Sequence, residues 1–538
     1  MAYATLTRMG LLAGVALAGC GPALAADTTA AQAGSLEQQV RDALGGLLGP
    51  AVKLSDRPVR ITAAGDHYDV AILPGFKNTP AAGGPAQDVQ ITAIARPGEK
   101  GTWLIDGVRT ASPLRFTVDT PLPPKEGQPR GTAVTVPVTY TIEQTSPDTR
   151  IVWDPTFASP STWTAASQAT TVRAEGGPLS QTTQIGPINY VSTLRPVGAD
   201  RVDVLLDGSA QDYRLNATPA TGPLDVGVKR IRFGMALNGV SRASSITILQ
   251  AMTSVLADAL QARPGAPPPK IAPELVRSVL AALKDFASDF TLDETLEGFI
   301  VKTQGQTVAM DQLKIGFDAK SETGLLRAGM TMGVQGIALP DMPLGDMAVL
   351  IPTRVALHPV VGGIGVAELM RMAQATSENK DPAPADIQAL FSHGGITAGL
   401  ESLSLDVAGA SLTGQAKFVA TGPSADLITG TAQLTVENFD GLMQKVTAIP
   451  SLAQQAVPVM VFIKGIGRTV GTKLVYDVVY KDGKVLINNV DLTAMAGGPA
   501  PAPRPPAEVA RPPIPAPAPA PAPGGAPKAN RPLPSWAK

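Results

Sequence analysis

The chain has 538 residues, of which 44% are apolar and 17% charged, with a mean hydropathy of +0.12. This composition can bury a core, which argues against an intrinsically disordered protein. The 44 Lys and Arg residues nearly balance the 45 Asp and Glu residues without long runs of either sign, so nothing indicates a nucleic-acid partner. Few aromatic residues, with 54 glycines and 50 prolines, favour many short strands and turns.

Residues 1–25 predict an export signal, because Arg8 precedes an apolar run that ends in small residues. Two processing signals lie close together in it. Ala23-Leu24-Ala25 is a small-x-small site for cleavage before Ala26, whereas Leu17-Ala18-Gly19-Cys20 is similar to the lipobox of bacterial lipoproteins, in which the cysteine is acylated. Both interpretations stay open. We favour acylation of Cys20, because the single cysteine of the chain stands where a lipobox requires it.

These signals predict an exported protein of the periplasm, anchored to the outer membrane if Cys20 carries a lipid. Gly21 is not the Asp that is associated with retention at the inner membrane. Neither processing route leaves a disulfide in the mature protein. The longest later apolar run, 457–463, is far shorter than the about 20 residues of a membrane-spanning helix.

Residues 26–220 predict an N-terminal β-rich domain. It starts with a short helix, for which Ser35 and Gln38 form a capping-box pattern and Gly49-Pro50 a stop. Apolar residues then alternate with polar ones over 59–72 on both sides of a Gly65-Asp66 turn, which predicts a half-buried hairpin.

Two later segments of this domain have different patterns. Residues 134–142 alternate clearly and predict a strand, at the edge of a sheet or at a bulge because Pro137 cannot donate to a ladder. Residues 154–187 are polar and rich in Ser and Thr, with Trp153 and Trp163 as large anchors, and we interpret them as loops and short strands.

Residues 221–498 predict one or more β-plus-helix domains. Strands that end at Leu237 lead into a helix near Ser244, a second group leads into a helix at 366–375, and a third into one at 440–446. Residues 273–286 form a further helix pattern, and 474–487 a hairpin around Lys481-Asp482-Gly483. We therefore expect an α+β, β-dominated fold of long curved antiparallel sheets, built of repeated strand-then-helix modules with helices packed on them.

Residues 499–538 are rich in Pro and Ala and predict a disordered tail that spaces or tethers the folded part. Its five cations, against Glu508 alone, suit contact with the anionic cell wall, the membrane or envelope proteins. The plain alternative is a solvated tail without a partner.

The search for catalytic or metal-binding residues assigns none, and we expect no enzyme and no cofactor. His67, His358 and His393 are the only histidines, and no two have metal-ligand spacing. Ser241 stands in a segment one residue short of a nucleophile elbow, but a serine between a strand and a helix more often enters the helix. Gly465-Ile466-Gly467 lacks the spacing of a nucleotide-binding loop. Paired carboxylates of a hydrolase stay a minor alternative, since their separation depends on the fold.

Residues 224–492 resemble a family of alphaproteobacterial envelope proteins, the domain-of-unknown-function family 2125, and more distantly AsmA-type proteins. The likeness rests on Gly430 to Val446 (GTAQLTVENFDGLMQKV) and on Leu474 to Leu492 (LVYDVVYKDGKVLINNVDL). The AsmA-type resemblance implies long twisted sheets with an apolar concave face and a role in envelope lipid homeostasis. Those relatives usually keep a membrane helix, which this sequence lacks after its leader.

Our first hypothesis is a non-enzymatic envelope protein that binds or shuttles lipid, acyl chains or another apolar ligand in a β-sheet groove. The alternating Val, Ile, Leu, Met and Ala residues with few aromatics predict an apolar surface that binds by area. The rival hypothesis is a structural or adaptor protein of the periplasm, whose apolar strand faces pack on each other and whose tail sets the distance to a partner.

Overall fold

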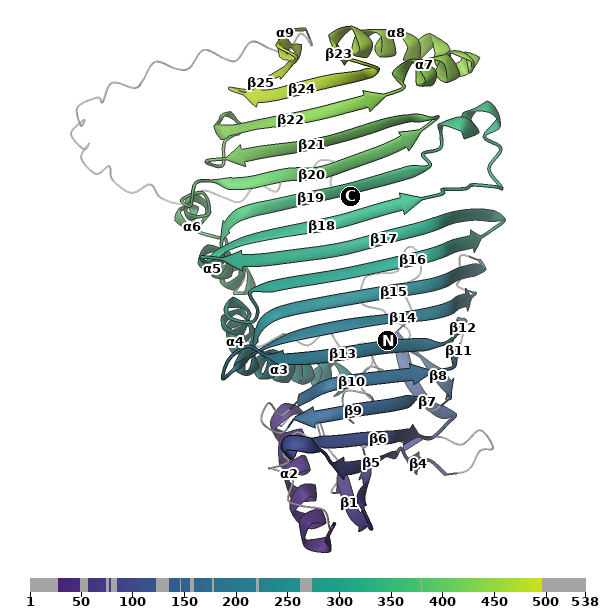
Figure 1. Ribbon diagram of the computed structural model, residues 1–538, viewed down its shortest axis with the longest axis vertical. Helices are drawn as coiled ribbons and strands as arrows, with labels where there is room; N and C mark the ends of the chain where they lie inside the picture. Colours follow the sequence, from purple (N-terminus) through teal and green to yellow (C-terminus); the bar gives the residue numbers. More distant parts are fainter. Residues whose placement is uncertain are drawn as a thin grey trace, which may run out of the picture. The chain divides into compact units, whose positions relative to one another are not determined.

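The computed structural model describes residues 28–48, 57–73, 77–78, 85–121, 135–145, 147–154, 159–176, 179–218, 222–261, 273–378 and 380–495 (Figure 1). The export signal, Cys20 and the Pro-rich tail lie outside them. Residues up to Leu492 form one compact unit, and the fold below is that of this unit. A short helix, α9 (Leu492–Met495), ends the described part.

A long antiparallel sheet forms most of this unit, and each of its main strands pairs with the next one along the chain (Figure 1). The strands also pair over most of their lengths, so their register is fixed by many backbone hydrogen bonds. In order across the sheet they are β14 (Arg201–Ala217), β15 (Leu224–Ser241), β16 (Asp289–Thr303), β17 (Gln306–Glu322), β18 (Leu325–Gln335), β19 (Arg354–Gly365), β20 (Ile396–Val407), β21 (Ala410–Ala420), β22 (Ile428–Glu437) and β24 (Lys473–Lys481). The last of them, β24, also pairs with β23 (Arg468–Val470) and β25 (Lys484–Ile487). The short strand β26 (Val490–Asp491) pairs with β25.

The sheet divides at β14, whose two halves pair with different strands. Residues 202–210 pair with β13 and residues 214–217 with β12, and Asp212 between them has a positive φ of 48°. One branch continues through β13 (Ile188–Pro196), β10 (Ser159–Ser167), β9 (Asp148–Asp154), β6 (Trp103–Thr110), β5 (Ile91–Pro97), β2 (His67–Ile72) and β1 (Val59–Ala64). The other continues through β12 (Leu179–Ile185), β11 (Thr170–Gly176), β8 (Thr135–Gln144) and β7 (Leu114–Pro121), and a separate pair is β3 (Lys77–Asn78) with β4 (Gln87–Asp88).

A filled core lies between the two branches. Ile105 and Ile151 of the first branch are fully buried and belong to one cluster with Ile142 of the second branch, which is 1% exposed. The helix α2 (Ala30–Leu48) adds Leu36 and Val40 to this cluster. The N-terminal end of the sheet is therefore a closed sandwich.

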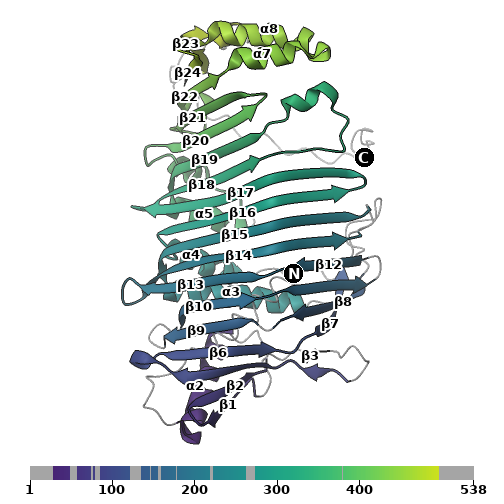
Figure 2. The same ribbon diagram turned by 45° about the vertical axis from the view of Figure 1, so that its right-hand side comes forward.

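Helices line one edge of the sheet and cover its C-terminal end. Figures 1 and 2 place α3 (Arg242–Gln261), α4 (Pro273–Lys284), α5 (Val366–Ser377) and α6 (Pro384–Ala389) along one edge, behind the sheet in both views. At the far end, α7 (Phe439–Thr447) and α8 (Pro450–Ile466) pack on β22 and β24. The described residues also include three short 3-10 helices, η1 (Glu99–Gly101), η2 (Gly345–Leu350) and η3 (Ala425–Leu427).

The β-dominated antiparallel fold is confirmed, as are the hairpins at 59–72 and 474–487. The repeated strand-then-helix modules are not confirmed. Helices do follow β15, β19 and β22, but the strands on either side of each insertion belong to one continuous sheet. The domain boundary expected between 220 and 221 falls between β14 and β15, which pair from Arg201↔Ser241 to Ala217↔Leu224.

One local prediction was wrong, and another was right in part. The capping box of α2 is formed by Thr29 and Gln32, six residues before the expected pair: the Gln32 N–H donates to Thr29 Oγ1 (3.2 Å), and the Thr29 N–H donates to Gln32 Oε1 (3.1 Å). The Ser/Thr-rich segment 154–187, for which we expected loops and short strands, contains the three strands β10, β11 and β12. Threonine is β-branched, which favours strands even where the pattern is polar.

We expect Ile151→Ala to lower the free energy of unfolding by about 2 to 5 kcal/mol, because Ile151 is fully buried in the filled core. The matched change Phe317→Ala should lower it by less than half as much, because Phe317 is 43% exposed. Urea denaturation followed by circular dichroism measures both. Equal losses would show that the main sheet is covered as completely as the sandwich.

Candidate functional site

One face of the main sheet consists of apolar side chains in rows that cross the strands. Residues that pair directly across an antiparallel ladder have side chains on the same face. The first row runs through nine strands, from β15 to β24, and each step is a direct pair. Its members are Ile231, Leu296, Leu313, Val334, Val355, Leu405, Leu412, Val436 and Leu474.

Two parallel rows widen this surface. We call the three rows together the apolar sheet face. The second row contains Phe233, Glu294, Ile315, Met332, Leu357, Leu403, Gly414, Leu434 and Tyr476, and the third begins with Leu206, Met235, Leu292, Phe317 and Met330.

No described element covers the middle of the apolar sheet face as a second layer. Every first-row residue from Ile231 to Val436 keeps part of its surface exposed. In the other two rows, Phe317 is 43% and Met332 40% exposed. The two buried clusters of the described residues lie at the two ends, in the sandwich and beneath α7 and α8. The face is therefore an open surface between two filled cores.

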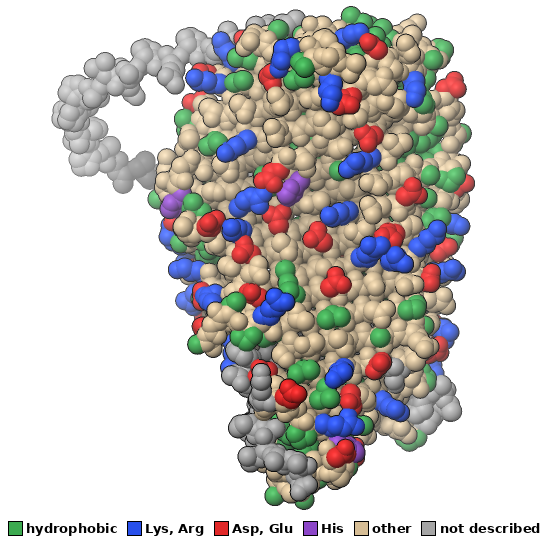
Figure 3. Space-filling model, viewed as in Figure 1, with side chains coloured by type: hydrophobic (Ala, Val, Ile, Leu, Met, Phe, Trp, Pro, Cys, Tyr) green, Lys and Arg blue, Asp and Glu red, His purple; other side chains and the backbone are tan. Residues whose placement is uncertain are grey.

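The opposite face of the same strands is polar. The row next to Ile231 contains Arg232, Thr295 and Lys314, followed by Gly333. Figure 3 shows a face on which Lys, Arg, Asp and Glu side chains are scattered among polar and backbone atoms, with few hydrophobic ones over the main strands. The two faces of one sheet thus differ sharply in polarity.

A charged cluster connects four neighbouring strands on this polar face. Asp318 Oδ2 accepts a hydrogen bond from Arg327 (2.8 Å), and Asp318 Oδ1 lies 3.1 Å from His358 Nε2. Glu401 contacts both Arg327 and His358, and its hydrogen bond raises the pKa of Arg327. Exposed ion pairs contribute about 0 to 1 kcal/mol each, so the cluster orders the face more than it stabilises it.

The apolar sheet face continues into a cavity at its N-terminal end. Ile231 pairs with Ala210 and then Ile188, and Phe233 pairs with Gly208 and then Tyr190. The third row reaches Trp163 through Ser192. These three end residues, Ile188, Tyr190 and Trp163, line a cavity of about 150 Å³ at the division of the sheet, together with residues such as Ile91 and Thr170.

The cavity has an apolar wall with polar groups at defined places. Trp163 and Tyr190 meet edge to face, with ring centroids 5.3 Å apart. No described residue accepts a hydrogen bond from the buried Trp163 Nε1–H. Burial also raises the pKa of the Tyr190 hydroxyl. Since an unpaired buried donor is unfavourable, the cavity suits a ligand that brings an acceptor or covers the ring.

Gly208 is required where the second row enters the cavity. A Cβ atom at this position would lie 2.3 Å from the Phe233 ring and 3.0 Å from Tyr190 Cβ. The Phe233 ring therefore lies against the backbone of β14, which a larger residue would prevent. The aromatic ring shields the glycine strand, a known device of sheet stabilisation.

At the C-terminal end, two helices cover the last residues of the rows. Leu474 and Tyr476 are 6% and 5% exposed, beneath Phe439 and Val446 of α7 and Met460 of α8. Tyr476 donates its hydroxyl to the carbonyl of Ile463 in α8 (3.1 Å). The helices thus close this end of the face in the same way that the sandwich closes the other.

Glu294 interrupts the second row between Phe233 and Ile315. Its side chain is exposed, and no described residue forms an ion pair with it. A charge in an apolar row needs water or a polar ligand group. This position is the one place in the three rows where the sheet offers a carboxylate.

The residues singled out from the sequence do not meet in one place. His67 lies beside Asp66 on the surface of β2, His358 belongs to the charged cluster, and His393 lies 3.6 Å from Glu368. Ser241 is 3% exposed, and its Oγ accepts the N–H of Ser244 in the first turn of α3, so it enters a helix as expected. No group of three or more His, Cys, Asp or Glu in the described ranges is placed to hold a metal.

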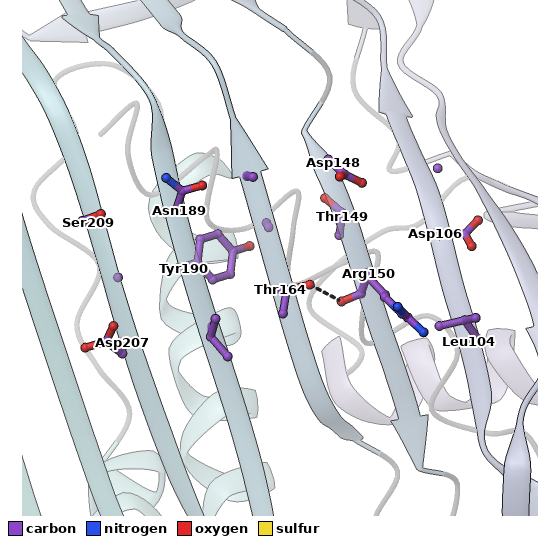
Figure 4. A pocket seen from close by; sticks show the side chains of 15 residues that line it. Leu104, Asp106, Asp148, Thr149, Arg150, Thr164, Asn189, Tyr190, Asp207 and Ser209 are labelled. Atoms are coloured by element: carbon purple, nitrogen blue, oxygen red, sulfur yellow. Dashed lines mark hydrogen bonds between the residues drawn. The ribbon is translucent and has the colours of Figure 1, made fainter.

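A shallow depression of about 850 Å³ crosses β6, β9, β10, β13 and β14 on the polar side (Figure 4). Its carboxylates, Asp106, Asp148 and Asp207, lie on three different strands, and Figure 4 shows them apart from one another. Asp106 pairs with Arg96 (2.7 Å) outside the depression. This arrangement does not bring two acids face to face.

The sequence led us to expect an apolar sheet surface, but it did not identify the residues that form the rows or the cavity at their end. The residues that end its rows, Trp163 and Tyr190, are far apart in the sequence and meet because β10 pairs with β13. In the sequence, these two residues are notable only as large aromatic side chains in or next to the polar segment 154–187.

Comparisons with family models, with curated proteins and with solved structures find no match for this chain. None of the helices in the described residues is long and apolar enough to cross a membrane.

We expect the alkaline stability of the protein to depend on Tyr190. Because its pKa is raised, the stability that neutral Tyr190 contributes is full below about pH 10, the pKa of an exposed tyrosine, and is lost as the pH rises above that value. Tyr190→Phe keeps the ring and removes the titrating group. Urea denaturation between about pH 9 and 11 should show a steeper loss in the wild type than in the variant. Parallel losses would contradict the assignment.

Proposed function

We propose that the protein binds acyl chains of lipids on the apolar sheet face and that it does so in the cell envelope. The observation that supports this proposal is the first row, whose eight aliphatic residues from Ile231 to Val436 stay part-exposed between two filled cores. Contiguous exposed apolar surface of this kind is rare in monomeric proteins and usually marks a binding site.

The size of the surface suits long hydrocarbon chains. The eight strands with part-exposed first-row residues, β15 to β22, have seven spacings of about 4.8 Å, which gives a row of about 34 Å. One leaflet of a bilayer is about 15 Å of hydrocarbon, half of the about 30 Å core. More than one acyl chain can therefore lie end to end along the rows.

The chemistry of the surface favours binding by area. Leu, Ile, Val, Met and Phe side chains offer no hydrogen-bonding groups, so a ligand gains chiefly from covering them, at about 25 cal/mol per Å². Glu294 is the exception. A carboxylate at that position disfavours an anionic group beside it and tolerates a neutral or cationic one.

The envelope location rests on the export signal in residues 1–25 and on the resemblance of 224–492 to envelope proteins. A protein in an aqueous compartment between two membranes can use such a face to shield acyl chains from water. The proposal does not require a catalytic residue.

The first test places a charge on the apolar sheet face. Met332→Glu should weaken the binding of a fluorescent fatty acid about tenfold, because the carboxylate must stay solvated where the chain would lie. The control is Thr331→Glu, on the same strand but on the other face, opposite Gly316. It should bind as the wild type does. Equal binding by all three proteins, or no binding by any of them, would contradict the proposal.

The second test uses the fluorescence of Trp163 to locate the bound acyl chain. A brominated fatty acid should quench the fluorescence of the wild type when it reaches the cavity, and most of this quenching should disappear in Trp163→Phe. Trp103 and Trp153 in the sandwich serve as internal controls, because both are buried. Quenching that is unchanged in Trp163→Phe would place the ligand elsewhere.

A further inference from the structure

The helix α8 at the end of the sheet has an outward side that is apolar in its second half. Its inward stripe, from Leu452 through Met460 to Ile463, packs in the cluster on β22 and β24. Three residues of the second half are exposed although they are apolar: Val459 and Val461 are both 56% exposed, and Phe462 is 42% exposed. The corresponding outward residues of the first half, such as Gln454, are polar.

The charges around this patch are mostly positive. The segment 450–473 contains Lys464, Arg468 and Lys473 and no Asp or Glu. Each of these three cations has an ion-pair partner on a neighbouring element: Lys464 pairs with Asp440 of α7 (2.6 Å), Arg468 with Asp477 of β24 (2.8 Å), and Lys473 with Glu437 of β22. Over 437–481, which includes all these partners, five cations and three carboxylates give 5 − 3, a net charge of +2.

We propose that α8 docks the protein on an anionic lipid surface. An interfacial helix combines exposed apolar residues on one side with flanking Lys and Arg, lies in the plane of the headgroups and need not span the bilayer. The exposed Val459, Val461 and Phe462 would enter the headgroup region, and Lys464 and Arg468 would contact anionic lipid phosphates.

The charges disfavour two other partners for the exposed side of α8, namely a second copy of the chain and the chain's own Pro-rich tail. In a two-fold dimer, α8 would face α8, which brings Lys464 and Arg468 of two copies toward like charges. The Pro-rich tail has five cations and one acid, so it has the same sign as the segment 450–473. An anionic lipid surface is complementary in both charge and apolarity.

This docking is independent of the proposed acyl-chain binding, because α8 lies at the end of the sheet and its outward residues belong to none of the three rows (Figure 2). The two proposals therefore have separate readouts. Loss of vesicle binding leaves fatty-acid binding intact, and the reverse also holds.

The test is co-sedimentation of the full chain with vesicles, using Cys20→Ser in every protein so that no acyl group contributes. Vesicles of phosphatidylglycerol and phosphatidylethanolamine should bind the protein, and vesicles of phosphatidylcholine should bind it more weakly. Phe462→Glu should lower the binding at least about tenfold, since it removes an apolar contact and adds repulsion. Leu283→Glu on α4 is the matched control, because Leu283 is also 42% exposed. It should bind as the parent protein does.

A second variant separates the electrostatic part. Lys464→Gln with Arg468→Gln should reduce binding to the anionic vesicles and flatten its dependence on salt, with little change on phosphatidylcholine. Circular dichroism and the thermal unfolding midpoint confirm that each variant is folded. Equal sedimentation of the parent and Phe462→Glu overturns the proposal. So does a concentration-dependent dimer in analytical ultracentrifugation that Phe462→Glu abolishes, since α8 would then face a second copy.

Discussion

The unbroken backbone register from β15 to β24 is the constraint on which the rest of the structure depends. Each strand hydrogen-bonds to the next, so one side-chain row extends through nine strands without changing face. A shift of one residue in any pair would turn the following apolar residues to the polar side. Register alone therefore keeps Ile231 and Leu474, at opposite ends of the row, on a common surface.

The surface remains open because the sheet has few partners of its own. Filled cores form only where a second layer is available, between the two branches beside β14 and beneath α7 and α8. The helices α3 to α6 lie along one edge, so among the described elements none forms a covering layer over the middle strands (Figures 1 and 2). Exposed Phe317 and Met332 lie in the stretch that an acyl chain would cover under the proposed function.

The sequence predicted strands well where apolar and polar residues alternate strictly, as in the hairpin at 59–72. It did not predict the extent of the strands where most residues are polar. The strands β10 to β12 contain many Thr residues whose β-branching, and not their polarity, suits a strand. Thr29 and Gln32 were overlooked as a capping box because the equally spaced Ser35 and Gln38 fit the same pattern. The sequence predicted an apolar sheet surface but not its residues or its cavity, since only strand pairing shows that Trp163 and Tyr190 end neighbouring rows.

The pairing order also bears on how the chain folds. From β15 to β22 every strand pairs with its sequence neighbour, so the sheet can grow by adding one hairpin at a time. The sandwich is different, because β6 pairs with β9 and β8 with β11 across intervening segments. Such non-local contacts close slowly. The N-terminal end is synthesised first and thus gains the time it needs, while the later strands assemble on it as a template.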